Sequence, residues 1–101
     1  MQFCARFLDM SSKVFRNHAL LRMSQRGISD VDVLNVLETG ETVEEYPDDF
    51  PFPSRLVLGW LKNRPIHVVV AHNTDQDEWI VITAYEPDSR GWIDGFRRRK
   101  T

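Results

Sequence analysis

The chain has little of the material from which disulfides and membrane spans are built. Its single cysteine, Cys4, excludes a disulfide within the chain and suits a reducing compartment. Its uninterrupted apolar stretches are only a few residues long, as at 68–71, far below the ~20 that span a bilayer. The first ten residues lack a basic start followed by a long apolar run, so no signal peptide is predicted. We therefore expect a cytoplasmic protein with no membrane partner.

Histidine is scarce too, and it lacks the spacing of a metal site. The three histidines, His18, His67 and His72, form no ligand pattern such as HExxH. His72 stands near Asp75 and Asp77 and is a metal candidate without a motif. The sequence therefore predicts no metal and no other cofactor.

Basic charge is missing from one long segment and concentrated in another. Residues 29–50 carry eight acidic and no basic side chains, whereas residues 89–101 carry five basic side chains against Asp94. The net charge of −2 argues against a generic nucleic-acid binder. The segregation fits either a basic and an acidic face on one small body or charge runs that are simply solvated.

The remaining composition fits one globular domain over residues 1–101, with 42% hydrophobic and 28% charged residues. Residues 15–39 predict a helical hairpin, because apolar side chains recur every three or four positions. In its first helix a second stripe recurs every four residues. That stripe consists of His18, Arg22 and Arg26. The segment before it, residues 1–13, fits either a strand or a short packed arm.

The two predicted helices meet at a sharp turn. Gly27 stands where a left-handed residue favours the end of a helix. Ser29 and Asp32 have the spacing of a capping box, which predicts the start of the second helix. We expect that helix to stop at Gly40.

After Gly40 the apolar pattern changes to a period of two, which predicts strands. The prolines of residues 47–53 predict a loop. The predicted strands are residues 41–46, 55–61, 66–72 and 78–85. The expected fold class is α+β, with two N-terminal helices packed on a four-stranded, mainly antiparallel sheet over residues 41–86.

The register of the last two strands decides which side chains meet. Placing His72 opposite Glu78 puts His67, Thr83 and Tyr85 on one side of the sheet. A slip of one residue breaks that grouping.

Residues 87–101 form a basic tail. Its aromatic and apolar side chains Trp92, Ile93 and Phe96 have helical spacing, which predicts a short C-terminal helix or tail that packs on the domain. The run at residues 97–100 is either a solvated end or a contact for phosphate or an acidic partner.

Several segments together resemble a known family. These are HALLRMSQRGIS, an acidic strand ending in Tyr-Pro, LVLGW, RPIHVVVA, IVITAYEPD and the Trp…FRRRK ending. In this order they resemble the bacterial domain-of-unknown-function family 4258 over residues 15–99. The resemblance implies a small bacterial protein with a fold similar to RelE/ParE-type toxins and other barnase/RelE-like ribonucleases. It also implies RNA or the ribosome and a small antitoxin protein as candidate partners.

Metal-independent RNA cleavage needs a base, an acid and cations around the phosphate. Histidine transfers protons near neutral pH, and arginine grips phosphate. We hypothesise that the catalytic residues are His18 and His67, which share proton transfer, and Tyr85, which orients the substrate. The predicted substrate-binding residues are Arg22, Arg26, Thr83, Arg97 and Arg98.

Each of these residues also has a structural interpretation. His67 lies in an apolar strand and fits a satisfied core residue, and His18 fits a partner of a backbone carbonyl or a carboxylate. The alternative function is a non-enzymatic binding module on the same fold. Because both faces of the predicted strands are apolar, such a module takes a protein partner or forms a homodimer through the exposed sheet face. An inactive relative of the toxins is a third interpretation.

Overall fold

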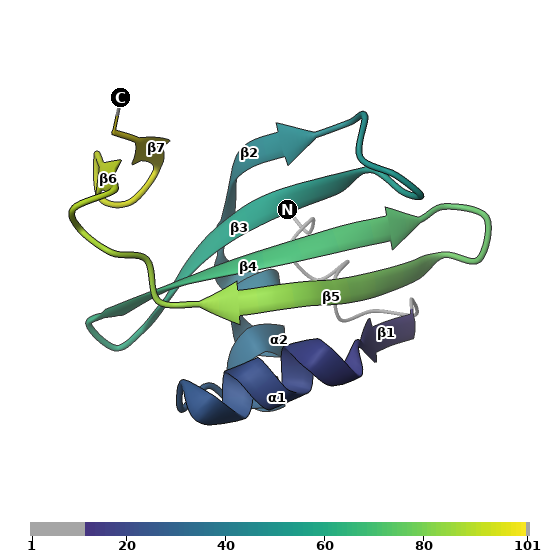
Figure 1. The fold of residues 1–101 in the computed structure, drawn as a ribbon, viewed down its shortest axis with the longest axis horizontal. Helices are drawn as coiled ribbons and strands as arrows, with labels where there is room; N and C mark the ends of the chain where they lie inside the picture. Colours follow the sequence, from purple (N-terminus) through teal and green to yellow (C-terminus); the bar gives the residue numbers. More distant parts are fainter. Residues whose placement is uncertain (1–11, 101) are drawn as a thin grey trace.

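The structure is a computed structural model that describes residues 12–100 (Figure 1). The predicted strand or arm at residues 1–13 lies almost wholly outside the described residues. The helices are α1 (Asn17–Gln25) and α2 (Asp30–Thr39). The strands are β1 (Ser12–Phe15), β2 (Glu41–Tyr46), β3 (Ser54–Leu61), β4 (Arg64–Asn73), β5 (Glu78–Tyr85), β6 (Trp92–Ile93) and β7 (Arg98–Arg99).

The helical hairpin forms where the sequence predicts it. Gly27 has a φ of 69°, the left-handed conformation that lets the chain turn between the helices. The Ser29 hydroxyl accepts a hydrogen bond from the Asp32 backbone N–H at 3.1 Å, and the Asp32 carboxylate accepts one from the Ser29 N–H at 3.0 Å. The capping box is therefore confirmed, and so is the end of α2 at Gly40.

The predicted four-stranded, mainly antiparallel sheet is wrong. The first five strands form one mixed sheet in the order β1-β5-β4-β3-β2, in which β1 runs parallel to β5. The sequence pattern did not indicate β1, because Phe15 lies four residues before Ala19 and also fits the apolar face of a helix. By pairing with β5, β1 occupies backbone groups that an edge strand would leave open.

The predicted C-terminal helix is also wrong. The tail folds into a two-stranded hairpin, in which β6 pairs with β7. We call residues 92–99 the C-terminal hairpin. At its turn Asp94, Gly95 and Phe96 have φ values of 55°, 65° and 72°. These left-handed conformations exclude a right-handed helix despite the helical spacing of the apolar side chains.

The register of β4 and β5 differs from the prediction by one residue at the loop. Glu78 pairs with Asn73, and a bulge further along the two strands brings His67 directly opposite Tyr85. Thr83 lies two residues before Tyr85 and points to the same side. His67, Thr83 and Tyr85 therefore do share one face.

Helices α1 and α2 cover one face of the sheet, and the core lies between the helices and the sheet. Gly59 permits close contact with α2, since a Cβ there would lie 2.8 Å from the Val36 side chain. The buried core side chains are Ala19, Met23, Ile28, Val33, Val36, Leu37, Val57, Ile66, Val68, Val70, Trp79, Val81 and Ala84.

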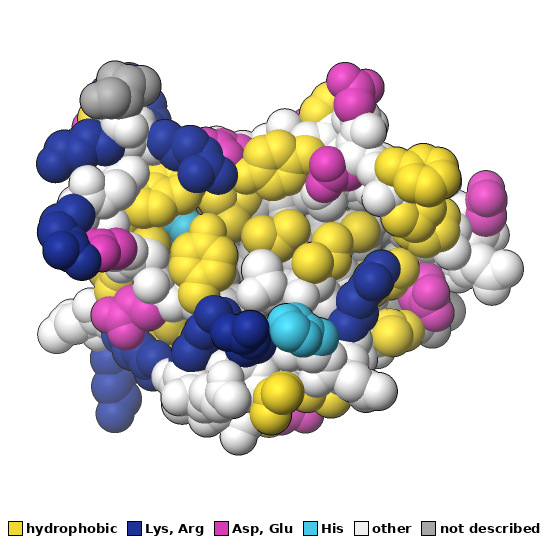
Figure 2. Space-filling model, viewed as in Figure 1, with side chains coloured by type: hydrophobic (Ala, Val, Ile, Leu, Met, Phe, Trp, Pro, Cys, Tyr) yellow, Lys and Arg dark blue, Asp and Glu magenta, His cyan; other side chains and the backbone are white. Residues whose placement is uncertain are grey.

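We call the opposite side of the sheet, which carries Trp60, His67 and Tyr85, the open face. Figure 2 shows this face, with hydrophobic side chains gathered across its middle. The C-terminal hairpin lies at one end of it (Figure 1). Basic side chains and a histidine follow its lower border, over α1 (Figure 2).

Candidate functional site

A cleft opens between the C-terminal end of α1, the end of β5 and the tail. It has a volume of about 610 Å³. We call it the tyrosine cleft, after the one phenol in its wall. Its lining residues are Arg26, Arg64, Tyr85, Glu86, Asp88 and Trp92.

His67 lies opposite Tyr85 on the neighbouring strand β4, and its side chain is fully buried. Its Nε2 lies 2.9 Å from the Phe96 carbonyl oxygen, and its Nδ1 lies 3.3 Å from the Tyr85 hydroxyl. Because a carbonyl only accepts, Nε2 carries the hydrogen, and Nδ1 accepts the hydrogen bond that Tyr85 donates. The backbone of Phe96 therefore fixes the tautomer of His67 and the orientation of the Tyr85 hydroxyl.

Burial determines the charge of this pair. It lowers the pKa of His67 below its ordinary value of 6.5, although the hydrogen bond to the Phe96 carbonyl opposes the shift. Burial also raises the pKa of Tyr85 above 10.0. Both groups are neutral at pH 7, so the phenol keeps its proton and donates it in a hydrogen bond to the imidazole nitrogen.

Two arginines from different elements line the cleft. Arg26 donates one hydrogen bond, from Nη1 to the Ala84 carbonyl at 2.9 Å. Since a guanidinium has five N–H donors, Arg26 keeps donors for a ligand. Arg64 is bound more completely, because it donates to the Arg26 carbonyl at 2.7 Å and to Glu86 at 2.8 Å. Arg64 thus ties the end of α1 to β4.

Trp92 supplies an aromatic wall. Its ring meets the His67 ring edge to face, with centroids 4.5 Å apart. Arg99 lies over the same indole, with its Cζ 4.9 Å from the ring centroid. The acidic lining is partly neutralised, since Arg90 lowers the pKa of Asp88 to about 2 and pairs with it at 2.8 Å. The cleft is therefore lined by an indole, a cation and a tyrosine.

The structure brings together only part of the predicted site. Arg26, His67 and Tyr85 meet at the tyrosine cleft. His18 and Arg22 are exposed on α1. His18 lies about 12 Å from Arg26 along the helix axis, because each residue rises about 1.5 Å. His18 is exposed and His67 is fully buried, and Tyr85 and Trp92 lie between His67 and the cleft.

The other predicted binding residues lie outside the cleft. Thr83 is half-buried on the open face, two residues before Tyr85. Arg97 pairs with Glu41 at 3.0 Å, and Arg98 pairs with Asp94 inside the C-terminal hairpin.

Sequence reasoning missed Arg64, Trp92 and the Phe96 carbonyl as parts of this site. The helical spacing predicts that Trp92 and Phe96 pack on the domain, but it does not indicate that they cover His67. A backbone carbonyl leaves no residue signal at all. The predicted strand begins at residue 66, which leaves Arg64 in the connection before it. In the structure β4 begins at Arg64, and the hydrogen bond to the Arg26 carbonyl shows that its side chain reaches the end of α1.

The metal candidate His72 lies elsewhere. Its ring stacks on Trp79 with centroids 3.8 Å apart, and its Nε2 lies 3.2 Å from an Asp77 oxygen. Within residues 12–100 no three His, Cys, Asp or Glu side chains come close enough together to hold a metal ion.

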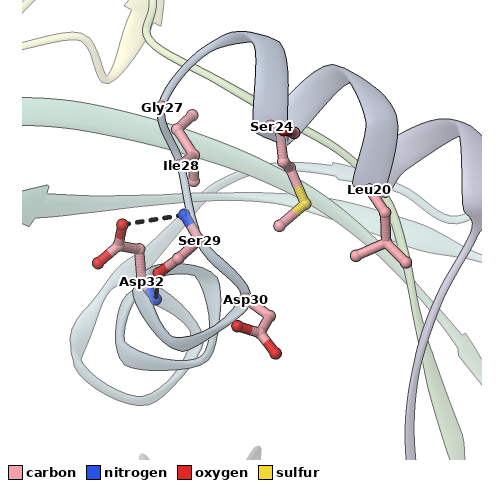
Figure 3. A pocket seen from close by; sticks show the side chains of 8 residues that line it. Leu20, Ser24, Gly27, Ile28, Ser29, Asp30 and Asp32 are labelled. Atoms are coloured by element: carbon pink, nitrogen blue, oxygen red, sulfur yellow. Dashed lines mark hydrogen bonds between the residues drawn. The ribbon is translucent and has the colours of Figure 1, made fainter.

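A second pocket, of about 410 Å³, lies between the two helices (Figure 3). Leu20, Met23 and Ile28 supply its apolar part. Its polar part consists of Ser24, Ser29, Asp30 and Asp32. Ser29, Asp30 and Asp32 all accept hydrogen bonds from backbone N–H groups at the start of α2, so this pocket carries less chemistry than the tyrosine cleft.

Comparison with known proteins gives one match. A family model described as "Domain of unknown function (DUF4258)" matches residues 15–86, which is more than half of the chain. No curated protein and no solved structure matches the chain. In the part of the chain that the structure describes, no helix is long and apolar enough to cross a membrane.

Proposed function

The chain belongs to the DUF4258 family, and from this premise we propose that it is an RNA-processing protein. In this proposal the tyrosine cleft binds single-stranded RNA and cleaves it without a metal ion. The observation that carries the proposal is the hydrogen bond from the Tyr85 hydroxyl to the buried, neutral His67. Tyr85 lines a cleft that also offers an arginine and an indole.

Binding rests on two kinds of contact. Arg26 has guanidinium donors left for a phosphate after it has bonded the Ala84 carbonyl. Trp92 offers the part of its indole that Arg99 and His67 leave uncovered, on which an unpaired base stacks. These two contacts favour a single strand over a duplex, whose bases are already stacked.

Cleavage rests on proton transfer through Tyr85. The RNA 2′-hydroxyl attacks the adjacent phosphorus and gives its proton to the Tyr85 oxygen, while Tyr85 passes its own proton to His67 Nδ1. The bond from phosphorus to the 5′-oxygen breaks, and water protonates the leaving oxygen. The products are a 2′,3′-cyclic phosphate and a 5′-hydroxyl. His67 returns its proton to solvent through Tyr85, so no redox partner is required.

The family resemblance gives this activity a cellular setting. A RelE-like toxin, restrained by a small antitoxin and acting on RNA or the ribosome, is consistent with two N-terminal helices packed on a sheet. We replace the hypothesis that His18 and His67 share proton transfer by a relay through Tyr85. His18 is exposed at the start of α1, about 12 Å from Arg26 along the helix axis.

Inducible expression in a bacterial host tests the proposed function. Wild type is compared with Tyr85→Phe and with Arg16→Ala, an exposed arginine just before α1, as the matched control. We expect wild type and the control to slow growth and to fragment RNA, and Tyr85→Phe to do neither while it stays folded. Normal growth with intact RNA in the wild-type culture would contradict the proposal.

A second candidate function is a binding module that acts through the open face. The hydrophobic side chains across the middle of that face favour it (Figure 2). The partner is then a protein or a second copy of the chain. The molecular mass in solution, measured by light scattering over a range of concentrations, shows whether the chain forms the homodimer that this second candidate allows.

A further inference from the structure

The C-terminal hairpin is attached to the acidic edge strand β2 through two arginines. Arg97 Nε lies 3.0 Å from a Glu41 oxygen, and Arg99 Nε lies 3.1 Å from a Glu44 oxygen. Arg99 also reaches the Tyr46 hydroxyl at 3.5 Å. These contacts join residues more than 50 positions apart in the chain.

The same arginines lie next to the tyrosine cleft. The Arg99 guanidinium covers Trp92, which is a wall of that cleft. Arg97 follows Phe96, whose carbonyl holds His67. The Arg99 guanidinium therefore lies beside the cleft, and Arg97 lies two residues before it in the same hairpin.

The Arg97–Glu41 pair is exposed on both sides, and the Arg99–Glu44 pair is exposed on the side of the arginine. The side chains of Arg97 and Glu41 are 46% and 52% exposed and that of Arg99 is 61% exposed, whereas Glu44 is 23% exposed and also accepts a hydrogen bond from the Tyr46 hydroxyl. Exposed pairs of this kind contribute little to stability. A phosphate offers a guanidinium the same two-pronged acceptor geometry as a carboxylate. Glu41 and Glu44 thus stand where phosphates of a bound strand would stand.

The hairpin itself has contacts that do not depend on these pairs. The Phe96 carbonyl bonds His67, and the Phe96 ring packs edge to face on Trp60 with centroids 6.0 Å apart. The guanidinium groups can therefore change partners while the backbone of the hairpin stays in place.

We propose that Arg97 and Arg99 form a phosphate-binding strip which Glu41 and Glu44 mask as internal competitors. The strip extends the tyrosine cleft and takes the phosphodiester backbone of the same RNA strand, so this inference rests on the proposed function. The carboxylates weaken binding of any polyanion that cannot displace them. They therefore set a threshold that favours a strand long enough to fill the cleft and the strip together.

The test removes the mask and measures binding by fluorescence anisotropy. The variant is Glu41→Gln with Glu44→Gln. The control is Asp48→Asn with Asp75→Asn, which removes two exposed carboxylates from loops at the other end of the sheet and gives the same net charge. We expect the unmasked variant to bind a labelled single-stranded RNA about 3- to 10-fold more tightly than wild type. The control is expected to change affinity less than about 2-fold.

Adding Arg97→Ala and Arg99→Ala to the unmasked variant identifies the source of any gain. We expect these substitutions to remove the gain. The strip is overturned if the control binds as tightly as the unmasked variant, or if the gain survives without the two arginines. Unfolding midpoints are recorded for every variant, so that a loss of fold is not counted as a loss of binding.

Inorganic polyphosphate, used as a second probe, separates this inference from the proposed function. It carries the charge of RNA but no base for Trp92 and no 2′-hydroxyl for Tyr85. A gain with polyphosphate, together with RNA that is bound but never cleaved, would support the strip and contradict the proposed cleavage. Cleavage by wild type without a gain for either probe would overturn the strip alone.

Discussion

At the scale of single residues, His67 joins the sheet to the tail because both of its ring nitrogens have partners. The alternating strand pattern predicted that His67 and Tyr85 share a face. It did not predict that Phe96 reaches His67 from 29 residues further along the chain. A side-chain face follows from the period of a strand, whereas a contact from a distant loop follows from the packing of the whole chain.

The buried His67 predicts a dependence of stability on pH. Its pKa is lowered in the folded state, so between that value and 6.5 the unfolded chain binds more protons than the folded chain. This contribution to the free energy of unfolding is fully present above pH 6.5. It is lost as the pH falls through the folded-state pKa. We expect the urea midpoint of wild type to decrease as the pH is lowered from 7.5 to 5.

His67→Gln, which keeps a polar side chain but does not titrate, should flatten this decline in the urea midpoint. His18→Gln is the matched control, because His18 is exposed, and it should leave the decline unchanged. An equally steep decline in the His67→Gln variant would show that His67 is not the group responsible.

At the scale of elements, local signals were readable and distant pairings were not. The turn between the helices was predicted from Gly27, Ser29 and Asp32. Each of these residues acts through its own backbone conformation or through a neighbour three residues away. The parallel pairing of β1 with β5 joins segments more than 60 residues apart and has no local signature. The hairpin turn at Phe96 has a left-handed conformation that costs about 1–3 kcal/mol in a non-glycine residue, so tertiary contacts impose it.

The capping box predicts the effect of a single substitution in α2. Ser29→Ala removes the acceptor for the Asp32 N–H and should destabilise the domain by about 1 kcal/mol. For a domain of this size that corresponds to about 4–8 °C in the melting temperature. Ser24→Ala, an exposed serine inside α1, is the control and should cause little change. A melting temperature of Ser29→Ala equal to that of wild type, measured by circular dichroism, would show that the box does not stabilise α2.

At the scale of the whole molecule, the segregated charges seen in the sequence meet in space. The acidic block at residues 29–50 includes β2, and the basic run at residues 97–100 includes β7. Arg97 and Arg99 pair with carboxylates of β2, so part of each charge block neutralises the other. Net charge alone therefore understates the basic surface that becomes available to a polyanion when those pairs exchange.

The whole-molecule arrangement also explains why the site was half predictable. Arg26 and Tyr85 were identified from residue chemistry and spacing. The cleft between them exists only because the tail, which carries Trp92, takes a position that no local pattern specifies. The hypothesis that His18 and His67 act together required the His18 end of α1 to reach the open face. Instead, the packing of α1 against β5 brings its C-terminal end, at Arg26, close to β5.

The central claim is that the Tyr85 hydroxyl, backed by His67, cleaves RNA without a metal ion. The most direct test is single-turnover cleavage of a 5′-labelled single-stranded RNA by the purified protein in the presence of EDTA. We expect 2′,3′-cyclic phosphate ends for wild type and Arg16→Ala, and a rate at least about 100-fold lower for folded Tyr85→Phe. No cleavage by wild type, or equal cleavage by Tyr85→Phe, would contradict it.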